Sequence, residues 1–230
     1  MTAARIAVII PTFNEAGSIG AVVGELPRDL VREVVVADGG STDGTQERAR
    51  AAGARVLDAG RGYGRACLLG AEAADPACDV LCWMDGDGAD RGDLLGRLAQ
   101  PVLDGTAEFS IASRTRGARE PGAMSWHQVL AGELAGLGMR LLYGVRYTDM
   151  CAYRVLRRDK LAGLAMREMT YGWNLEMQMR AAKAGLRVAE VPMPYRRRAA
   201  GESKVAGSLR GTVRAGTRIA TVFVREARRR

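Results

Sequence analysis

Histidine and paired cysteines are scarce in this sequence, and each scarcity argues against a class of site. His127 is the only histidine among 230 residues, and because one histidine cannot make a zinc site, we expect His127 in a polar loop. The four cysteines, at positions 67, 78, 82 and 151, lack CxxC spacing, which argues against a zinc knuckle or a disulfide framework. We expect all four to be buried, reduced thiols.

Aromatic residues make up only 5% of the chain, which leaves little surface for stacking nucleic-acid bases. Lysine and arginine outnumber aspartate and glutamate by 34 to 26, giving a net charge of +8. This charge favours anionic partners such as nucleotides, phosphates or an acidic membrane surface. Without a helix-turn-helix or RNA-binding signature, nucleic acid is the least supported of these partners.

Long apolar runs are also missing. No run approaches the roughly 20 residues that a membrane span needs, and the N-terminus lacks the charged-then-apolar pattern of a signal peptide. We therefore expect a cytoplasmic protein, at most peripheral at the inner face of a membrane.

Short apolar runs alternate with helical patterns through the first half of the chain, which predicts parallel strands joined by crossover helices. The expected strands cover residues 5–11, 33–38, 54–59, 79–85 and 108–114, and the expected helices cover 15–26, 41–53, 62–74 and 91–103. In the second half we expect helices over 127–144 and 174–186, an extended segment over 146–156 and a strand over 187–196. The fold class is therefore α/β, a single domain with a mostly parallel central sheet flanked by helices, followed by a basic helix or tail over 205–230.

Four of the predicted strands end in polar segments: "PTFNE", "ADGGSTDGT", "DGDGAD" and "SRTRG". Ligands of such sheets bind beyond the carboxyl ends of the strands. A structural role is open for several of these residues, because Thr12 or Asn14 could cap a helix, and Ser41 could cap a helix whose first turn carries Asp43. Asp38, at a strand end, could instead accept hydrogen bonds from a ribose or a base.

The segment "DGDGAD" carries the sharpest chemical signal. Asp85 and Asp87 repel each other unless a cation neutralises them, and the glycines between and after them let the backbone wrap around an ion. Oxygen ligands favour Mg²⁺ or Mn²⁺ over zinc. The alternative is a polar turn that binds nothing.

These motifs resemble the nucleotide-diphospho-sugar domain of the family 2 glycosyltransferases. The later segments "TDMCAYRVLRRD" and "YGWNLEMQMRAAKAGLRVAEVPMPYRRRAAGESKV" resemble the catalytic domains of polyprenyl-phosphate (dolichyl-phosphate) mannose and glucose synthases. The resemblance covers about residues 5–210 and implies a GT-A type domain, here residues 1–204. It implies Mg²⁺ or Mn²⁺ on Asp85 and Asp87, with Asp90 as a further ligand. The donor-binding residues that it implies are Pro11, Thr12, Asn14, Glu15, Asp38, Asp43, Gly86, Arg114 and Lys204.

The chain departs from the family pattern at four places. Gly39 stands where a second Asp usually follows Asp38, and Ala89 stands where a third metal ligand is often found. The segment "SWHQVLAG" offers His127 and Gln128 where polyprenyl-phosphate enzymes place an arginine, which argues against that acceptor. The last departure concerns catalysis, because Trp173 and Asn174 replace a Glu-Asp pair whose Asp serves as the general base of hydroxyl-acceptor enzymes. A phosphate acceptor needs no such base, since its oxygen is already ionised. Asp149 is the remaining base candidate.

We therefore expect a metal-dependent, inverting glycosyltransferase that moves a sugar from a UDP- or GDP-sugar to a polyprenyl phosphate or another phosphate-bearing acceptor. Catalysis would depend on Asp85, Asp87 and Arg198. The alternative is transfer to a hydroxyl of a soluble metabolite or glycan, with Asp149 as base. A sugar-1-phosphate nucleotidyltransferase is less supported, because "PTFNEAG" lacks the basic residues that grip a triphosphate.

The C-terminal segment leaves two readings open. Apolar and small residues recur at near-helical spacing beside a row of arginines, Arg210, Arg214 and Arg218. The apolar and small positions are Leu209, Val213, Gly216, Ala220 and Phe223. This pattern fits an interfacial helix on an anionic membrane surface, or a helix packed on the domain with its arginines solvated.

Overall fold

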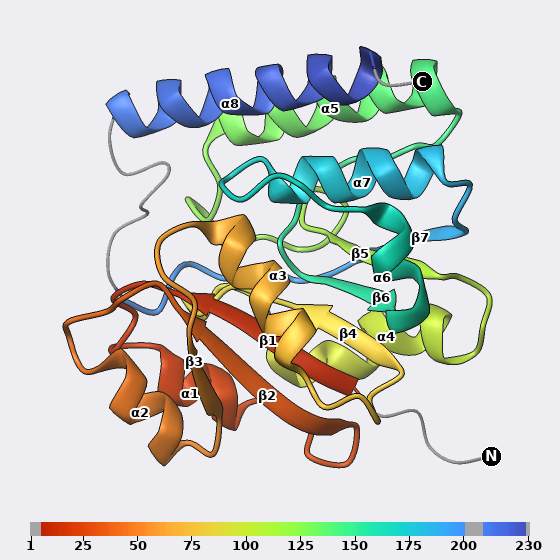
Figure 1. Cartoon of the computed structure of the whole chain (residues 1–230). Coiled ribbons are helices and arrows are strands. Elements are labelled where there is room, and N and C mark those ends of the chain that lie inside the picture. Colours follow the sequence, from red (N-terminus) through yellow and green to blue (C-terminus); the bar gives the residue numbers. More distant parts are fainter. Residues whose placement is uncertain (1–5, 201–208, 229–230) are drawn as a thin grey trace.

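The computed structural model describes residues 6–200 and 209–228, and a seven-stranded mixed sheet lies at its centre (Figure 1). The strands are β1 (Ile6–Thr12), β2 (Val31–Asp38), β3 (Arg55–Asp58), β4 (Val80–Trp83), β5 (Phe109–Ser113), β6 (Arg154–Arg157) and β7 (Val188–Pro192). Their order is β3-β2-β1-β4-β6-β5-β7, and only β6 runs antiparallel to its neighbours. The expected α/β fold with a mostly parallel sheet is confirmed.

Helices cover both faces of this sheet. They are α1 (Ile19–Gly24), α2 (Thr45–Ala51), α3 (Tyr63–Ala73), α4 (Leu95–Leu103), α5 (Trp126–Tyr143), α6 (Arg158–Leu164), α7 (Trp173–Lys183) and α8 (Leu209–Arg228), with a 3₁₀ turn, η1 (Gly92–Leu94), before α4. Helix α6 was not predicted. The expectation of a loop around His127 was wrong, because a capping box formed by Ser125 and Gln128 starts α5 one residue before His127.

Alternating side chains of β1 contact different helices, as expected for a strand covered on both faces. A Cβ on Gly70 of α3 would lie 2.6 Å from Ile9 Cγ2, so α3 packs closely on one face. The next residue, Ile10, lies on the face of Ile19 at the start of α1, since both side chains surround Gly86. The four cysteines are buried and unpaired, as expected.

The second half of the chain joins the same sheet through β6, which lies between β4 and β5. Val155 pairs with Cys82 on one side and with Ser110 on the other. The neighbouring Arg154 is fully buried, and its guanidinium donates to backbone carbonyls of Cys151, Ala152 and Asn174. These bonds satisfy a buried cation and connect β6 to α7.

Helix α8 lies beside α5 and contacts α7 (Figure 1). Arg218 pairs with the buried carboxylate of Glu168, and Arg225 pairs with both Glu168 and Glu176. The expectation of a helix packed on the domain agrees with these contacts, but Arg218 is not simply solvated, because its partly exposed guanidinium pairs with a buried acid far away in the sequence. The side chains of Arg210 and Arg214 lie outside the described part of the chain. Of the helices within residues 6–200 and 209–228, none combines the length and the apolar content needed to cross a bilayer.

Candidate functional site

The carboxyl ends of β1, β2, β4 and β5 bring the predicted site residues to one edge of the sheet. Thr12 ends β1 and pairs in register with Asp38 at the end of β2, while Asp85 follows β4 and Arg114 follows β5. This convergence follows from the parallel arrangement of the strands.

Asp38 is fully buried and organises the first part of this edge. Its carboxylate accepts hydrogen bonds from Thr12 Oγ1 at 3.0 Å and Gln46 Nε2 at 2.8 Å, and from both the backbone and the hydroxyl of Ser41. Burial acts to raise the pKa of Asp38, but the bonds from Ser41, Gln46 and Thr12 outweigh it and lower the pKa. The aspartate therefore stays ionised.

The loop after β1 is tied to the loop after β2. Asn14 has a left-handed backbone (φ 53°), and its Oδ1 accepts a hydrogen bond from the backbone N–H of Thr42 at 3.0 Å. Asp43 Oδ2 accepts one from the backbone N–H of Ala16, also at 3.0 Å. The helix-cap expectations for Thr12, Asn14 and Ser41 were wrong, because their side chains bridge the two loops instead.

Pro11 is buried inside β1, where it pairs with Ala37. Gly86, in the loop after β4, lies too close to β1 to carry a side chain without displacing its neighbours. A Cβ on Gly86 would lie 3.0 Å from Thr12 Cγ2. This close contact brings the "DGDGAD" loop directly against the end of β1.

Three carboxylates of the "DGDGAD" loop lie in or near the protein interior. Asp87 and Asp90 are 4% exposed, and Asp85 is half-buried, with Oδ1 accepting a hydrogen bond from the Tyr63 hydroxyl at 3.1 Å. Burial and the negative charge of Asp87 raise the pKa of Asp85 to about 6. Burial and the charges of Asp85 and Asp87 raise the pKa of Asp90 to about 8. The raised pKa values show that burial and mutual repulsion disfavour full ionisation of this loop, a penalty that a bound cation would relieve.

Asp85 and Asp87 could supply some of the ligands of a divalent cation, but the described side chains do not form a complete metal site. In residues 6–200 and 209–228, no group of three or more His, Cys, Asp or Glu side chains has the arrangement of a complete metal site. Mg²⁺ is commonly held by one or two carboxylates together with substrate phosphates and water. The pair Asp85 and Asp87 matches that mode, whereas a third ligand role for Asp90 stays a prediction.

Arg198 reaches this loop from the segment after β7. Its Nη1 lies 2.8 Å from Asp87 Oδ2, and its Nη2 lies 3.0 Å from Glu15 Oε1. Its Nε is buried without a hydrogen-bond partner in the described part of the chain. Lys204 lies outside the described residues.

Arg114 and Asp149 form a second ion pair at the site. Arg114 Nε and Nη2 each lie 2.7 Å from an oxygen of Asp149, which also accepts the backbone N–H groups of Arg114 and Met150. Asp149 is 2% exposed, and the Arg114 guanidinium lies over the Tyr195 ring, 5.0 Å from its centroid. The carboxylate is therefore occupied by donors, and it positions Arg114.

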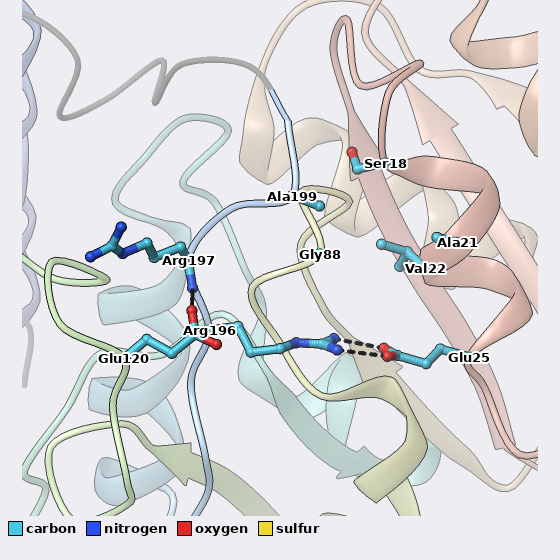
Figure 2. A pocket seen from close by; sticks show the side chains of 9 residues that line it. All are labelled: Ser18, Ala21, Val22, Glu25, Gly88, Glu120, Arg196, Arg197 and Ala199. Atoms are coloured by element: carbon cyan, nitrogen blue, oxygen red, sulfur yellow. Dashed lines mark hydrogen bonds and ion pairs between the residues drawn. The ribbon is translucent and has the colours of Figure 1, made fainter.

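Sequence reasoning missed the contacts that hold the Arg198 segment in place. Arg196 makes two 2.8 Å bonds to the carboxylate of Glu25, which directly follows α1, beside a cavity of about 200 Å³ (Figure 2). The backbone N–H of Ala199 donates to the carbonyl oxygen of Asp87 at 2.9 Å. No local pattern marks such pairs, because the partners are more than 100 residues apart in the chain.

Comparisons with known proteins place this chain among characterised relatives. Residues 7–164 match the model of "Glycosyl transferase family 2". The chain is 36% identical over 225 residues to the undecaprenyl-phosphate mannosyltransferase of Micrococcus luteus, with 90% of each chain covered. It is 33% identical over 218 residues to the polyprenol monophosphomannose synthase of Mycolicibacterium smegmatis, covering 89% of this chain and 82% of that protein.

A solved structure shares the fold. Glucosyl-3-phosphoglycerate synthase from Mycobacterium tuberculosis, in complex with Mn²⁺, uridine diphosphate and glucosyl-3-phosphoglycerate, matches with a TM-score of 0.73 at 21% identity, covering 97% of this chain and 80% of that one. The expected GT-A fold is thereby confirmed. From the family match and the two polyprenyl-phosphate relatives, it follows that this chain is a glycosyltransferase that belongs to glycosyl transferase family 2.

Proposed function

We propose that this glycosyltransferase moves a hexose from a nucleoside-diphosphate sugar to the phosphate of a polyprenyl phosphate. Two relatives, an undecaprenyl-phosphate mannosyltransferase and a polyprenol monophosphomannose synthase, support this acceptor class. The uridine diphosphate in the solved neighbour supports a UDP-sugar, and a GDP-sugar is the other candidate donor. Residues 1–204 would form the transferase domain, working at the inner face of a membrane, with residues 205–230 as an appended helix.

The donor would lie along the edge of the sheet. Asp38 and the loop bonds around it would shape the nucleoside pocket together with Pro11 and Thr12, and Asp85 and Asp87 would hold Mg²⁺ or Mn²⁺ at the diphosphate. The cation, when bound, supplies positive charge that stabilises the departing diphosphate. Arg198, already within 2.8 Å of Asp87, would supply charge from the chain itself.

The pairing of Asp149 with Arg114 is the main observation that favours a phosphate acceptor over a hydroxyl acceptor. A hydroxyl acceptor needs a general base, but Asp149 accepts four hydrogen bonds and lies almost fully buried. Asn174, at the start of α7, cannot take a proton. A phosphate oxygen is already ionised and can attack the anomeric carbon directly, with inversion in a single in-line step.

Thermal unfolding in the presence of UDP, GDP, dTDP and CDP, each with and without Mn²⁺, tests the donor half of the proposal. A ligand that binds only the folded protein raises its melting temperature. One nucleotide is expected to do so mainly with Mn²⁺, and Asp85→Asn with Asp87→Asn should remove the metal-dependent part. If that part survives in the double variant, the metal assignment is wrong.

The acceptor half is tested by supplying the preferred donor with either a polyprenyl phosphate or free sugars and glycans. The proposal predicts product only on the lipid phosphate. Product on a hydroxyl, with none on the lipid phosphate, would instead support the alternative in which Asp149 acts as a base.

A further inference from the structure

Five large apolar side chains lie exposed along one face of α5. Trp126 is 77% exposed, Leu130 44%, Leu134 60%, Leu137 53% and Leu141 78%. At 3.6 residues per turn they fall within an arc of about 80° on the helix. We refer to these five residues as the α5 stripe.

The opposite face of α5 already packs on the domain. Gly132, Ala135, Gly136 and Met139 are buried there, and a Cβ on Gly136 would lie within 2 Å of the Tyr147 carbonyl oxygen. The helix is therefore apolar on two faces, and packing on the domain explains only one of them.

Helix α8 lies along a third side of α5 and does not cover the stripe in the described part of the chain. The ring of Phe223 approaches Gly138, which lies outside the arc, and Tyr143 donates to the carbonyl oxygen of Glu226. The two contacts occur in the same order along both helices, so α5 and α8 run in the same direction. They lie side by side at one edge of the molecule (Figure 1).

The stripe has the composition of a surface that meets an anionic bilayer. Arg140 on α5 and Arg146, which follows the helix, are exposed, and Glu133 is the one exposed acid of α5. A tryptophan at the end of an apolar helix face is typical of the membrane interface. Monomeric soluble proteins rarely expose contiguous apolar patches of this kind.

The stripe also begins beside the candidate site. The loop before α5 contacts the Arg198 segment, since Arg119 forms a β-bridge with Tyr195 and Glu120 accepts the backbone N–H of Arg197. A surface that starts at this loop would bring the site to a lipid whose phosphate lies at headgroup level.

We propose that the α5 stripe is the membrane-docking face of this enzyme: α5 lies in the plane of an anionic bilayer surface, its five apolar side chains enter the acyl boundary, and the exposed arginines meet the lipid phosphates. This inference rests on the proposed lipid-phosphate acceptor. It assigns the membrane contact to the apolar face of α5 and not to Arg218, because Arg218 and Arg225 both pair with Glu168.

Vesicle binding by the full chain, without donor or acceptor, tests the docking face. Vesicles of phosphatidylcholine with about 30% phosphatidylglycerol should bind the protein, and pure phosphatidylcholine should bind it more weakly. Trp126 is a natural reporter, since Trp83 and Trp173 are 1% and 0% exposed. Brominated acyl chains should quench tryptophan emission in the parent protein, and Trp126→Phe should remove that quenching.

Leu134→Gln with Leu137→Gln should lower the vesicle partition coefficient about 10-fold or more, because two inserted apolar side chains are lost. Leu142→Gln is the matched control, as it changes a 48% exposed leucine of the same helix outside the arc. The inference is overturned if the double variant binds like the control, or if Trp126 is not quenched. It is also overturned if light scattering shows a dimer that the double variant dissociates, with no vesicle binding by either protein.

A water-soluble, short-chain isoprenyl phosphate separates this inference from the proposed function. The stripe variant should keep its transfer to this soluble acceptor and lose transfer to the long-chain acceptor in vesicles. If the parent protein transfers to no isoprenyl phosphate but still binds vesicles through the stripe, the proposed acceptor is wrong and the docking face stands.

Discussion

The guanidinium of Arg198 lies 2.8 Å from the carboxylate of Asp87, in the loop that we assign to the metal and the diphosphate. The same guanidinium reaches Glu15, so Arg198 connects the ends of β1 and β4 to the segment after β7. A cation bound to Asp87 would compete with Arg198 for that carboxylate, which would free the arginine to face the diphosphate.

Arg198→Ala should therefore separate catalysis from metal binding. We expect kcat to fall about 100-fold, as when one preorganised charged donor is removed, while the apparent affinity for Mn²⁺ in the presence of the nucleoside diphosphate is not weakened. Arg197→Ala is the control, because its guanidinium contacts the Pro121 carbonyl oxygen instead. A loss of Mn²⁺ affinity in Arg198→Ala would contradict the competition between Arg198 and the cation.

The convergence of the four strand ends could be predicted, because parallel strands with polar carboxyl ends must present those ends at one edge. The roles of individual residues could not. Thr12 and Asn14 looked like helix caps, yet Thr12 bonds to Asp38 and Asn14 to the backbone of Thr42, contacts that exist only once β1 and β2 pair.

Helix α5 was predicted from its apolar content, but the presence of apolar residues on two of its faces was not. One signal was present in the sequence: glycines at 132 and 136 lie one turn apart on the buried face, while leucines at 130, 134, 137 and 141 lie on another. The partners of the C-terminal arginines had no such signal, because Glu168 and Glu176 become neighbours of α8 only through tertiary packing.

Asp149→Asn tests whether this residue acts as a base or positions Arg114. Asparagine keeps an acceptor oxygen but loses the charge, so we expect about a 10-fold loss of kcat/KM for the acceptor, from a less well positioned Arg114, with an unchanged pH–rate profile. Loss of a general base would instead cost about 10²–10⁴-fold and remove one limb of the profile. The profile therefore decides between the two roles even where the magnitudes overlap.

Glu168→Gln should show how much the ion pairs of α8 contribute to the free energy of unfolding. Burial acts to raise the pKa of Glu168, but the hydrogen bond from Thr170 and the ion pair with Arg218 outweigh it and lower the pKa. A lowered folded-state pKa gives stability that is present above the unfolded pKa of about 4.3 and is lost as the pH falls through the folded value.

At pH 7 we expect the variant to lose about 2 kcal/mol in the free energy of unfolding, less than a fully buried pair because solvent screens the partly exposed Arg218. In denaturant titrations the parent protein and the variant should converge only as the pH falls through the lowered folded-state pKa of Glu168, because the glutamate is then protonated in the folded as well as in the unfolded parent protein. Glu47→Gln, an exposed acid of α2, is the control. A difference that stays constant with pH would rule out the ion-pair explanation.

Gly88→Ala tests how closely the Ala199 segment must lie on the "DGDGAD" loop. Gly88 has a left-handed backbone (φ +79°), and an added Cβ would lie 2.9 Å from Ala199 Cβ. The substitution should lower kcat/KM about 10–100-fold by displacing the segment that carries Arg198. Ala199→Gly in the same chain removes the steric contact and leaves the backbone strain, which costs about 1–2 kcal/mol. Partial recovery of activity in the double variant is therefore expected, whereas no recovery would assign the whole defect to the backbone of Gly88.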